Sequence, residues 1–587
     1  MHPRPAFRPA FRRAFAPLTL TASTVALAAL APAPAMAMAE GMADLIITNA
    51  RVYTVDDAHP WAEAVAIRDG RIIAVGTAGE VASQKGAQTK VVDLKGKLLL
   101  PAFGDAHNHP VFGGMSHARC ALHSGKSIED YRRIIAKCIA ETPGTSVIYG
   151  VGWEDGLFPP NGVPTKDILD TLSTTRPLIF RSTGGHSLWV NSKALQLAGI
   201  TKATKDPLNG KIDRDPKTGE PIGGLQEAAQ ELVDGIMPET TGQDLQDAIA
   251  YTARHFNSLG ITSWHDAGIE WQEDGSSAVV DAYKAVADKG LLTVDVAIDL
   301  KWKNDKGLEQ LPGLLKASQR ARTLGITARG VKFYIDGVIP QQTAYMLKPY
   351  EGTQELGAPQ IRPDVLAAAT TALDEQGIQS HYHTIGDAAV REALDAVAMA
   401  RRSDGNADTR PMISHMNVID PADQARFGTL GVTAIFQPLW TCNEPYMDLT
   451  KERIGPVRSQ YIYPVASIEK FGGRVAYGAD WSVASADPLL GIEVALTRVA
   501  PEGKLAPLIA GEAVTLAQAV KSYTLEVAYV NHLDQETGSI APGKSADLVV
   551  LDKDIFKLDT RRIHEAKVMT TLFKGKPVFG TLEAAAR

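Results

Sequence analysis

Between residues 98 and 535, short apolar runs alternate with longer segments whose apolar residues recur at helical spacing. This alternation is typical of βα units, in which helices cover both faces of a parallel sheet. Nine runs have the length and composition of strands: residues 98–103, 178–182, 261–265, 292–298, 330–335, 378–383, 412–415, 432–436 and 475–478. A closed (β/α)8 barrel needs eight strands, so we expect that one of these runs lies outside the barrel or is not a strand.

Short strand-like segments that do not alternate with helical segments lie at the two ends of the chain. They comprise residues 44–55, 64–75 and 91–92 before the alternating region, and residues 546–551, 568–573 and 578–579 after it. Neither set alone would bury much apolar surface, so we expect the two to form one domain. The predicted fold is therefore α/β: a TIM-like (β/α)8 barrel over residues 98–535, with an insertion at about 116–221, and a small composite β-sandwich domain built from residues 40–97 and 536–587.

The first 39 residues are predicted to be an export signal. Four arginines and no acidic residue precede an apolar stretch from Ala14 to Ala35, and small residues around Ala39 offer cleavage sites. A membrane anchor is the alternative, but three prolines interrupt the apolar stretch. The segment 12–15, Arg-Arg-Ala-Phe, also resembles a twin-arginine signal. We expect an exported, periplasmic protein that is not bound to the membrane after cleavage.

Charge and cysteine content exclude several other classes of protein. The formal net charge is −7 and the pI is about 6.1, so the chain has no basic footprint for nucleic acid. Three cysteines without a C-x-x-C spacing exclude a disulfide scaffold and a cysteine-based zinc site, while one disulfide remains compatible with export. The expected partner is a small-molecule substrate. No sequence feature demonstrates a homodimer, which stays open.

His107 and His109 stand directly after the first run of the alternating region. Residues i and i+2 of a strand point to the same side, so both imidazoles can face the barrel axis and share a metal ion. The carboxyl ends of the strands are also where active sites of such barrels lie. Two hydrogen-bonded histidines near a turn are the alternative interpretation.

Lys332 lies in the run 330–335, on the face opposite Val331 and Phe333. A strand of a parallel barrel is buried on both faces, so an inward lysine is desolvated and its neutral amine is favoured. A neutral amine can add carbon dioxide, and the resulting carbamate can bridge two metal ions. The alternative is a lysine on an exposed edge strand.

Three further candidate ligands end later runs. His383 and His415 each close a strand, and Asp480 follows the last one, where a carboxylate can bind a metal ion and accept a proton from water. His381 has the same parity as His383, but His383 lies nearer the carboxyl end of its strand. A helix N-cap is the alternative role for Asp480. Nitrogen and oxygen ligands without cysteine suit Zn²⁺, with Mn²⁺, Fe²⁺ or Co²⁺ as alternatives.

Several segments besides the ligands resemble the amidohydrolase superfamily. They comprise residues 150–153, 181–195, 223–227, 266–268, 487–491 and 538–551, and the resemblance extends from about Asp44 to Gly580. It is to the YtcJ-like, or amidohydrolase 3, branch, which includes the N-substituted formamide deformylases. The resemblance implies that His107 and His109 are first-strand ligands and Lys332 a carboxylated bridge. It further implies that His383 and His415 are ligands on the fifth and sixth strands. Asp480 would be both the ligand on the eighth strand and the general base.

The resemblance also implies a function. We expect a metal-dependent amidohydrolase that cleaves a non-peptide C–N bond, in an amide, formamide or cyclic amide, through a metal-activated hydroxide. The resemblance places His186, and with less support Glu227, near the substrate, where His186 would act in catalysis by polarising a carbonyl; a purely structural role behind the ligands is the alternative for His186. Trp153 belongs to a set of aromatic residues that indicates a partly aromatic pocket. Whether the site holds one metal ion or two stays open. Ester or lactone hydrolysis at the same site and an exported, non-catalytic metal- or ligand-binding protein are the alternatives.

Overall fold

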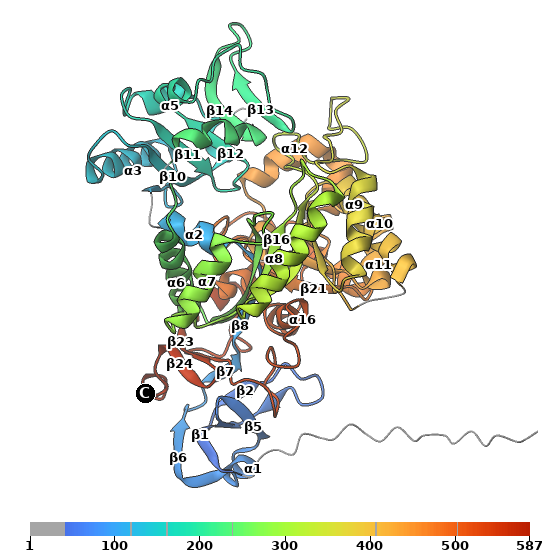
Figure 1. The fold of residues 1–587 in the computed structure, drawn as a ribbon. Helices are drawn as coiled ribbons and strands as arrows, with labels where there is room; N and C mark the ends of the chain where they lie inside the picture. Colours follow the sequence, from blue (N-terminus) through green and yellow to red (C-terminus); the bar gives the residue numbers. More distant parts are fainter. Residues whose placement is uncertain (1–40, 118–119, 160–161, 238, 405–407, 502) are drawn as a thin grey trace, which may run out of the picture. The chain divides into compact units, whose positions relative to one another are not determined.

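The computed structural model describes residues 41–117, 120–159, 162–237, 239–404, 408–501 and 503–587. The predicted export signal lies outside the described residues. Residues Met42–Arg587 form one compact unit, shown in Figure 1. In the described part of the chain, no helix is long and apolar enough to cross a membrane.

Eight parallel strands form the central sheet, in the order β21-β20-β19-β18-β17-β16-β15-β8. Their bounds are β8 (Phe103–Asn108), β15 (Ile261–Ile269), β16 (Asp295–Lys301), β17 (Thr327–Tyr334), β18 (Gln379–Thr384), β19 (Met412–His415), β20 (Thr433–Phe436) and β21 (Arg474–Tyr477). The first and last strands also meet, because the backbone N–H of Asp480 after β21 donates to the carbonyl of His107 in β8 at 2.8 Å. The predicted TIM-like barrel is confirmed.

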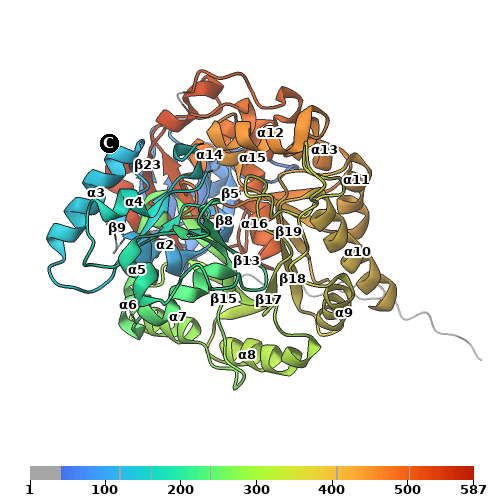
Figure 2. The ribbon, with the colours of Figure 1, turned by 90° about the horizontal axis from the view of Figure 1, so that it is seen from above.

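Helices surround this sheet in Figure 2. They include α6 (Gly242–Ser258), α7 (Ala278–Asp288), α8 (Leu311–Thr323), α9 (Pro363–Asp374), α10 (Asp387–Asp404), α11 (Pro421–Leu430), α14 (Pro488–Thr497) and α16 (Leu525–Val530). In α6, Leu245, Ile249 and Phe256 recur at helical spacing and are buried in the main core. Thr241 begins that helix with a capping box, in which its hydroxyl accepts from the backbone N–H of Asp244.

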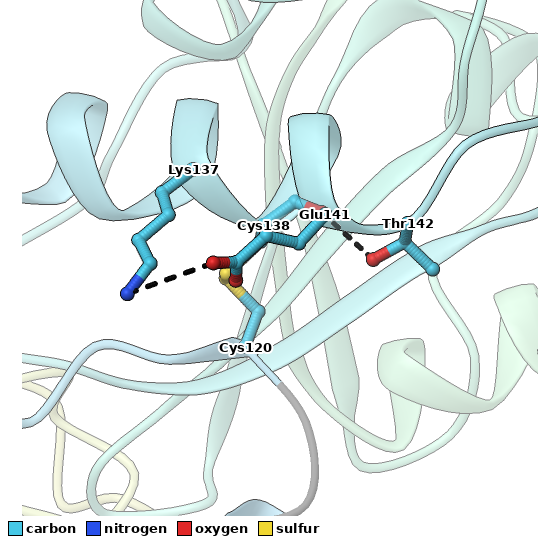
Figure 3. The surroundings of a disulfide bond; sticks show 5 residues. All are labelled: Cys120, Lys137, Cys138, Glu141 and Thr142. Atoms are coloured by element: carbon cyan, nitrogen blue, oxygen red, sulfur yellow. Dashed lines mark hydrogen bonds and ion pairs between the residues drawn. A yellow bond between two sulfur atoms is a disulfide. The ribbon is translucent and has the colours of Figure 1, made fainter.

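One of the nine expected strands lies outside the barrel, the first of the two alternatives that the sequence left open. The run 178–182 is β11 (Leu178–Ser182), which belongs to a second sheet in the order β13-β14-β12-β11-β10-β9. The other strands of this sheet are β9 (Cys120–Ala121), β10 (Ile148–Trp153), β12 (Ser187–Val190), β13 (Gly210–Arg214) and β14 (Pro221–Glu227). A disulfide between Cys120 and Cys138 joins β9 to α3 (Ile128–Glu141), as Figure 3 shows.

The two ends of the chain share a β-domain of two sheets. One has the order β5-β4-β1-β6, with β1 (Ala43–Thr48), β4 (Ala64–Arg68), β5 (Arg71–Gly76) and β6 (Lys85–Asp93). The other has the order β24-β23-β22-β7-β2-β3, with β2 (Arg51–Tyr53), β3 (Trp61–Ala62), β7 (Leu98–Pro101), β22 (Leu548–Leu551), β23 (Val568–Phe573) and β24 (Lys576–Gly580). Side chains of both sheets, such as Ile47 and Val550, pack in one core. The composite β-domain is confirmed.

The run 98–103 corrects one expectation. It was predicted to be the first barrel strand, but the structure divides it between β7, which pairs with β22 and β2, and β8, which begins at Phe103. The apolar residues continue without a break from Leu98 to Phe103, so hydrophobic pattern alone does not show where the chain passes from one sheet to the next.

Candidate metal centre

Two histidines at the carboxyl end of β8 face the same carboxylate. His107 Nε2 lies 3.5 Å from Oδ1 of Asp480, and His109 Nε2 lies 3.2 Å from the same oxygen. His107 is fully buried, whereas the side chain of His109 is 25% exposed. The i, i+2 spacing therefore delivers both imidazoles to one point, as the sequence predicts.

Asp480 and His415 both hold backbone conformations that favour glycine. The φ angle is +53° at Asp480 and +79° at His415. Such angles cost a side-chain-bearing residue about 1–3 kcal/mol and concentrate at functional sites. His415 is further held by Gln437, whose Oε1 lies 3.1 Å from Nδ1, and by Trp440, whose ring stacks on the imidazole. The fold thus holds both residues in an unfavourable backbone conformation that brings their side chains toward each other.

Lys332 and His383 complete the group. Lys332 Nζ is fully buried and lies 3.3 Å from Nε2 of His107. The His383 ring lies 4.6 Å from that of His415, measured between centroids. The structure therefore brings all six predicted ligands together at the carboxyl end of the barrel, while their role as ligands stays a prediction.

Burial and neighbouring charges set the protonation of this group. Burial alone would raise the pKa of Asp480, but the close approach of His109 and the charges of His415 and Lys332 outweigh it and lower that pKa to about 2. Burial lowers the pKa of His415 to about 3 and holds those of His107 and His383 well below their usual value. Burial also lowers the pKa of Lys332 to about 7, against the opposing charges of Asp480 and Asp299. Neutral imidazoles around one carboxylate are a suitable donor set for a cation.

The spacing of these atoms fits a divalent metal ion. Ligand atoms at 2.0–2.2 Å from a tetrahedral ion lie about 3.3 Å apart, close to the 3.2 and 3.5 Å between Asp480 Oδ1 and the two histidines. The candidate ligand atoms of His107, His415 and Asp480 all lie within 4.8 Å of one another. His383 Nε2 and Asp480 Oδ1 are buried without a hydrogen-bond partner among the described residues. Such atoms are costly unless a ligand or ion satisfies them.

His186 and Glu227 approach the same point from the insertion. They stand at the ends of β12 and β14, where His186 Nδ1 lies 2.9 Å from Oε2 of Glu227. The His186 ring centroid is 5.5 Å from that of His383. Burial would lower the pKa of His186, but the charge and hydrogen bond of Glu227 outweigh it and raise the pKa. The insertion thus places a group that can carry positive charge beside the candidate ligands.

Two cavities meet at these residues. Their volumes are about 750 and about 580 Å³, and both are lined by His186, His383, His415 and Asp480. The predicted substrate contact Trp153 does not line either of them. It is fully buried in the core of the insertion, and its indole N–H donates to the carbonyl of Phe180 at 2.9 Å. That position gives Trp153 no surface for a substrate, whereas Trp440 lines the smaller cavity.

Asp336 is a site residue that the sequence reasoning did not identify. Its carboxylate accepts the backbone N–H groups of Tyr345, Ile385 and Gly386 at 2.8–2.9 Å, which ties together the loops after β17 and β18. The sequence does contain a signal for Asp336, because residues an even number apart share a face of a strand and Asp336 therefore lies on the same face as Lys332. Gln437 was missed as well, although it follows β20 directly, at the end of the barrel where the other polar residues gather.

The chain is similar to known proteins along most of its length. The sequence model of the Amidohydrolase family matches residues 90–579. The N-substituted formamide deformylase of Arthrobacter pascens is 26% identical over 546 residues, covering 91% of this chain and 98% of that protein. Protein LONG AFTER FAR-RED 3 of Arabidopsis thaliana is 28% identical over 550 residues, covering 92% of each. A metal-dependent hydrolase of Pyrococcus horikoshii has a solved structure with a TM-score of 0.67 at 23% identity, covering 88% of this chain and 99% of that one, which supports the fold.

Proposed function

This chain belongs to the amidohydrolase family and is a metal-dependent hydrolase, and we propose that it cleaves the C–N bond of a small amide, formamide or cyclic amide. One observation carries the proposal: the buried carboxylate of Asp480 lies 3.5 Å from His107 and 3.2 Å from His109, where two cavities meet. The relationship to an N-substituted formamide deformylase supports the choice of a C–N bond.

The nitrogen and oxygen donors gathered around Asp480 support a set of six ligands. We propose that His107, His109, Lys332, His383, His415 and Asp480 hold one or two divalent ions, with Zn²⁺ the best match to nitrogen and oxygen donors. An ion in this position supplies Lewis acidity and lowers the pKa of water. A carbamate formed on the amine of Lys332 would add a carboxylate-like ligand to this set, and the burial of Nζ beside His107 supports that modification.

Asp480 is proposed to move the proton. With a pKa of about 2 its carboxylate is ionised at neutral pH, so it can accept a proton from the attacking water. The same proton can then pass to the leaving nitrogen, which must be protonated to depart as an amine. An ester needs this second transfer less, because an alkoxide or phenoxide leaves more readily than an amide anion. A carboxylate that can both accept and return a proton is therefore needed more for the hydrolysis of an amide than for that of an ester.

His186 is proposed to bind the substrate carbonyl. Its Nδ1 is engaged with Glu227, which leaves Nε2 as a donor toward the reacting group. The neighbouring carboxylate raises the pKa of His186, so the ring can carry the positive charge that stabilises a developing oxyanion. The hydroxyl of Thr343 donates to Oε1 of Glu227 at 3.2 Å and holds this pair in place.

Export to the periplasm is proposed from two features. Residues 1–39 resemble a cleavable signal, and the Cys120–Cys138 disulfide is typical of an oxidising compartment. The mature N-terminus, determined by mass spectrometry on protein from the periplasmic fraction, tests this proposal. A full-length N-terminus in the cytoplasmic fraction would contradict it.

A panel of substrates tests the reaction. Matched pairs that share an acyl group but carry an amide, a formamide, a cyclic amide or an ester should be compared by kcat/KM, with the His186→Ala variant as a control for adventitious hydrolysis. The proposal predicts turnover of at least one C–N substrate that falls by about 100-fold or more in the variant, as expected when an oxyanion donor is removed. Turnover of esters and lactones alone would establish the alternative.

A further inference from the structure

Inside the barrel, adjoining the proposed ligand His107, lies a second cluster of titratable side chains. His265 on β15, Asp299 on β16 and His381 on β18 are each at most 1% exposed, and their candidate ligand atoms lie within 4.8 Å of one another. We propose that these three residues form a buried positioning chain that keeps the proton of His107 on Nδ1 and leaves Nε2 free to bind the metal ion. The inference rests on the proposed metal centre and explains how one of its ligands is prepared.

The chain begins at Asp299. Its Oδ2 lies 2.6 Å from Nδ1 of His381 and 2.8 Å from Nε2 of His265. A carboxylate oxygen only accepts, and an imidazole lone pair at these distances would be repelled, so both nitrogens carry protons. The other nitrogen of His265 donates to Oδ1 of Asn531 at 2.7 Å. His265 is therefore an imidazolium that balances the buried charge of Asp299.

His381 links Asp299 to the metal centre, because Asp299 fixes which of its two ring nitrogens carries the proton. With its proton on Nδ1, the neutral ring presents Nε2 as an acceptor. That nitrogen lies 2.6 Å from the hydroxyl of Ser414 and 3.0 Å from Nδ1 of His107, and the hydroxyl is itself 2.9 Å from Nδ1 of His107. His107 consequently donates from Nδ1. The opposite direction would place the proton of its neutral ring on Nε2, the nitrogen that faces Asp480, and would block coordination.

The same distances argue against a metal ion inside this cluster. The contacts of 2.6 and 2.8 Å at Asp299 are shorter than the separation of about 3.3 Å expected between ligands around one ion. Asp299 Oδ2, His381 and Ser414 are joined by direct contacts, and His265 meets the same oxygen in an ion pair, whereas the atoms around Asp480 are spaced to hold an ion. Asp299 Oδ1 and His265 Nε2 themselves have no hydrogen-bond partner among the described residues. Gly330 on the adjacent strand β17 supports the closed arrangement, because a Cβ there would lie 1.7 Å from Oδ1 of Asp299. The backbone leaves room for this carboxylate and for little else.

The test is Asp299→Asn, which preserves shape and removes the charge. Metal affinity, measured by competition with a chromogenic chelator, should fall 10–100-fold, as is typical when the partner that orients a ligand is lost. In metal-free protein labelled with nitrogen-15 histidine, the His107 resonance should show the Nδ1–H tautomer in the wild type and lose it in the variant. Asp374→Asn is the matched control: Asp374 is a buried carboxylate paired with Arg401 at 2.7 Å on the helical layer, and its loss should leave affinity unchanged.

A milder variant keeps the test informative if Asp299→Asn fails to fold. Ser414→Ala removes the hydroxyl but retains the direct contact of 3.0 Å between His381 and His107, so affinity should fall by less than 10-fold with the tautomer preserved. Wild-type affinity in Asp299→Asn, or a His107 tautomer protonated on Nε2 in the wild type, would overturn the proposal. A loss of one bound ion at saturation would instead make the cluster a metal site. A wild-type chain that binds no metal would refute the proposed function. The tautomer of His107 in the metal-free protein would still show whether the positioning chain exists.

Discussion

Replacing Asp480 with asparagine probes the centre of the proposed site. The side chain keeps its shape but cannot ionise or accept a proton from water. In the metal-free chain its pKa is about 2 against an ordinary 3.8, and each unit corresponds to about 1.4 kcal/mol, so the surroundings favour the ionised form by about 2 kcal/mol. Because this pKa is lowered, the stabilisation is present above the ordinary value and is lost as the pH falls through about 2.

We therefore expect metal-free Asp480→Asn to lose about 2 kcal/mol in the free energy of unfolding, by the same amount at pH 6 and at pH 8. Denaturant unfolding followed by circular dichroism measures this difference. With metal restored to saturation, kcat on a C–N substrate should fall by about 10²–10⁴-fold, the usual contribution of a general base. A variant that binds metal at saturation and turns over within a few-fold of the wild type would refute the role assigned to Asp480.

Three further predictions concern the disulfide of the insertion, His186 and Lys332. Replacing Cys120 and Cys138 together with serine should lower the stability of the insertion by about 3 kcal/mol, given the sequence separation of 18 residues, and limited proteolysis should cut the insertion faster. Glu227→Gln should lower the pKa of His186, because the charge and hydrogen bond of Glu227 raise that pKa in the folded protein. The pair therefore stabilises the folded protein at low pH, and this stabilisation is lost as the pH rises through the pKa of His186. An NMR titration in which His186 has the same pKa in the variant and in the wild type would contradict the pairing. Lys332 should give a carbamate signal in carbon-13 NMR after incubation with labelled bicarbonate and metal, absent in Lys332→Gln; no signal from the wild type would remove the bridging role.

Strand parity and strand ends explain why much of the site could be predicted. His107 and His109 project together because residues two apart share a face, and Lys332 is buried because its strand is covered on both sides. The passage from β7 to β8 could not be located, because an unbroken apolar run does not record which sheet each residue joins. Trp153 was misplaced for a related reason: its aromatic character suits a pocket wall and a core equally well.

The positioning chain lay beyond sequence reasoning altogether. Asp299, His265 and His381 come from three different strands, and only the register of the barrel places them in contact. The left-handed conformations of His415 and Asp480 were equally hidden, since neither residue is glycine and no local pattern marks them. Distances of an ångström or less separate a closed hydrogen-bonded cluster from a metal site, and such differences appear only in coordinates.

The most direct test of the central claim is metal analysis of the purified mature protein, combined with a hydrolysis assay before and after treatment with a chelator. The account predicts one or two equivalents of a divalent metal per chain, loss of C–N bond hydrolysis on chelation, and recovery when the ion is returned. Protein without bound metal, and without activity after reconstitution with zinc, manganese, iron or cobalt, would contradict the assignment of these six residues as ligands.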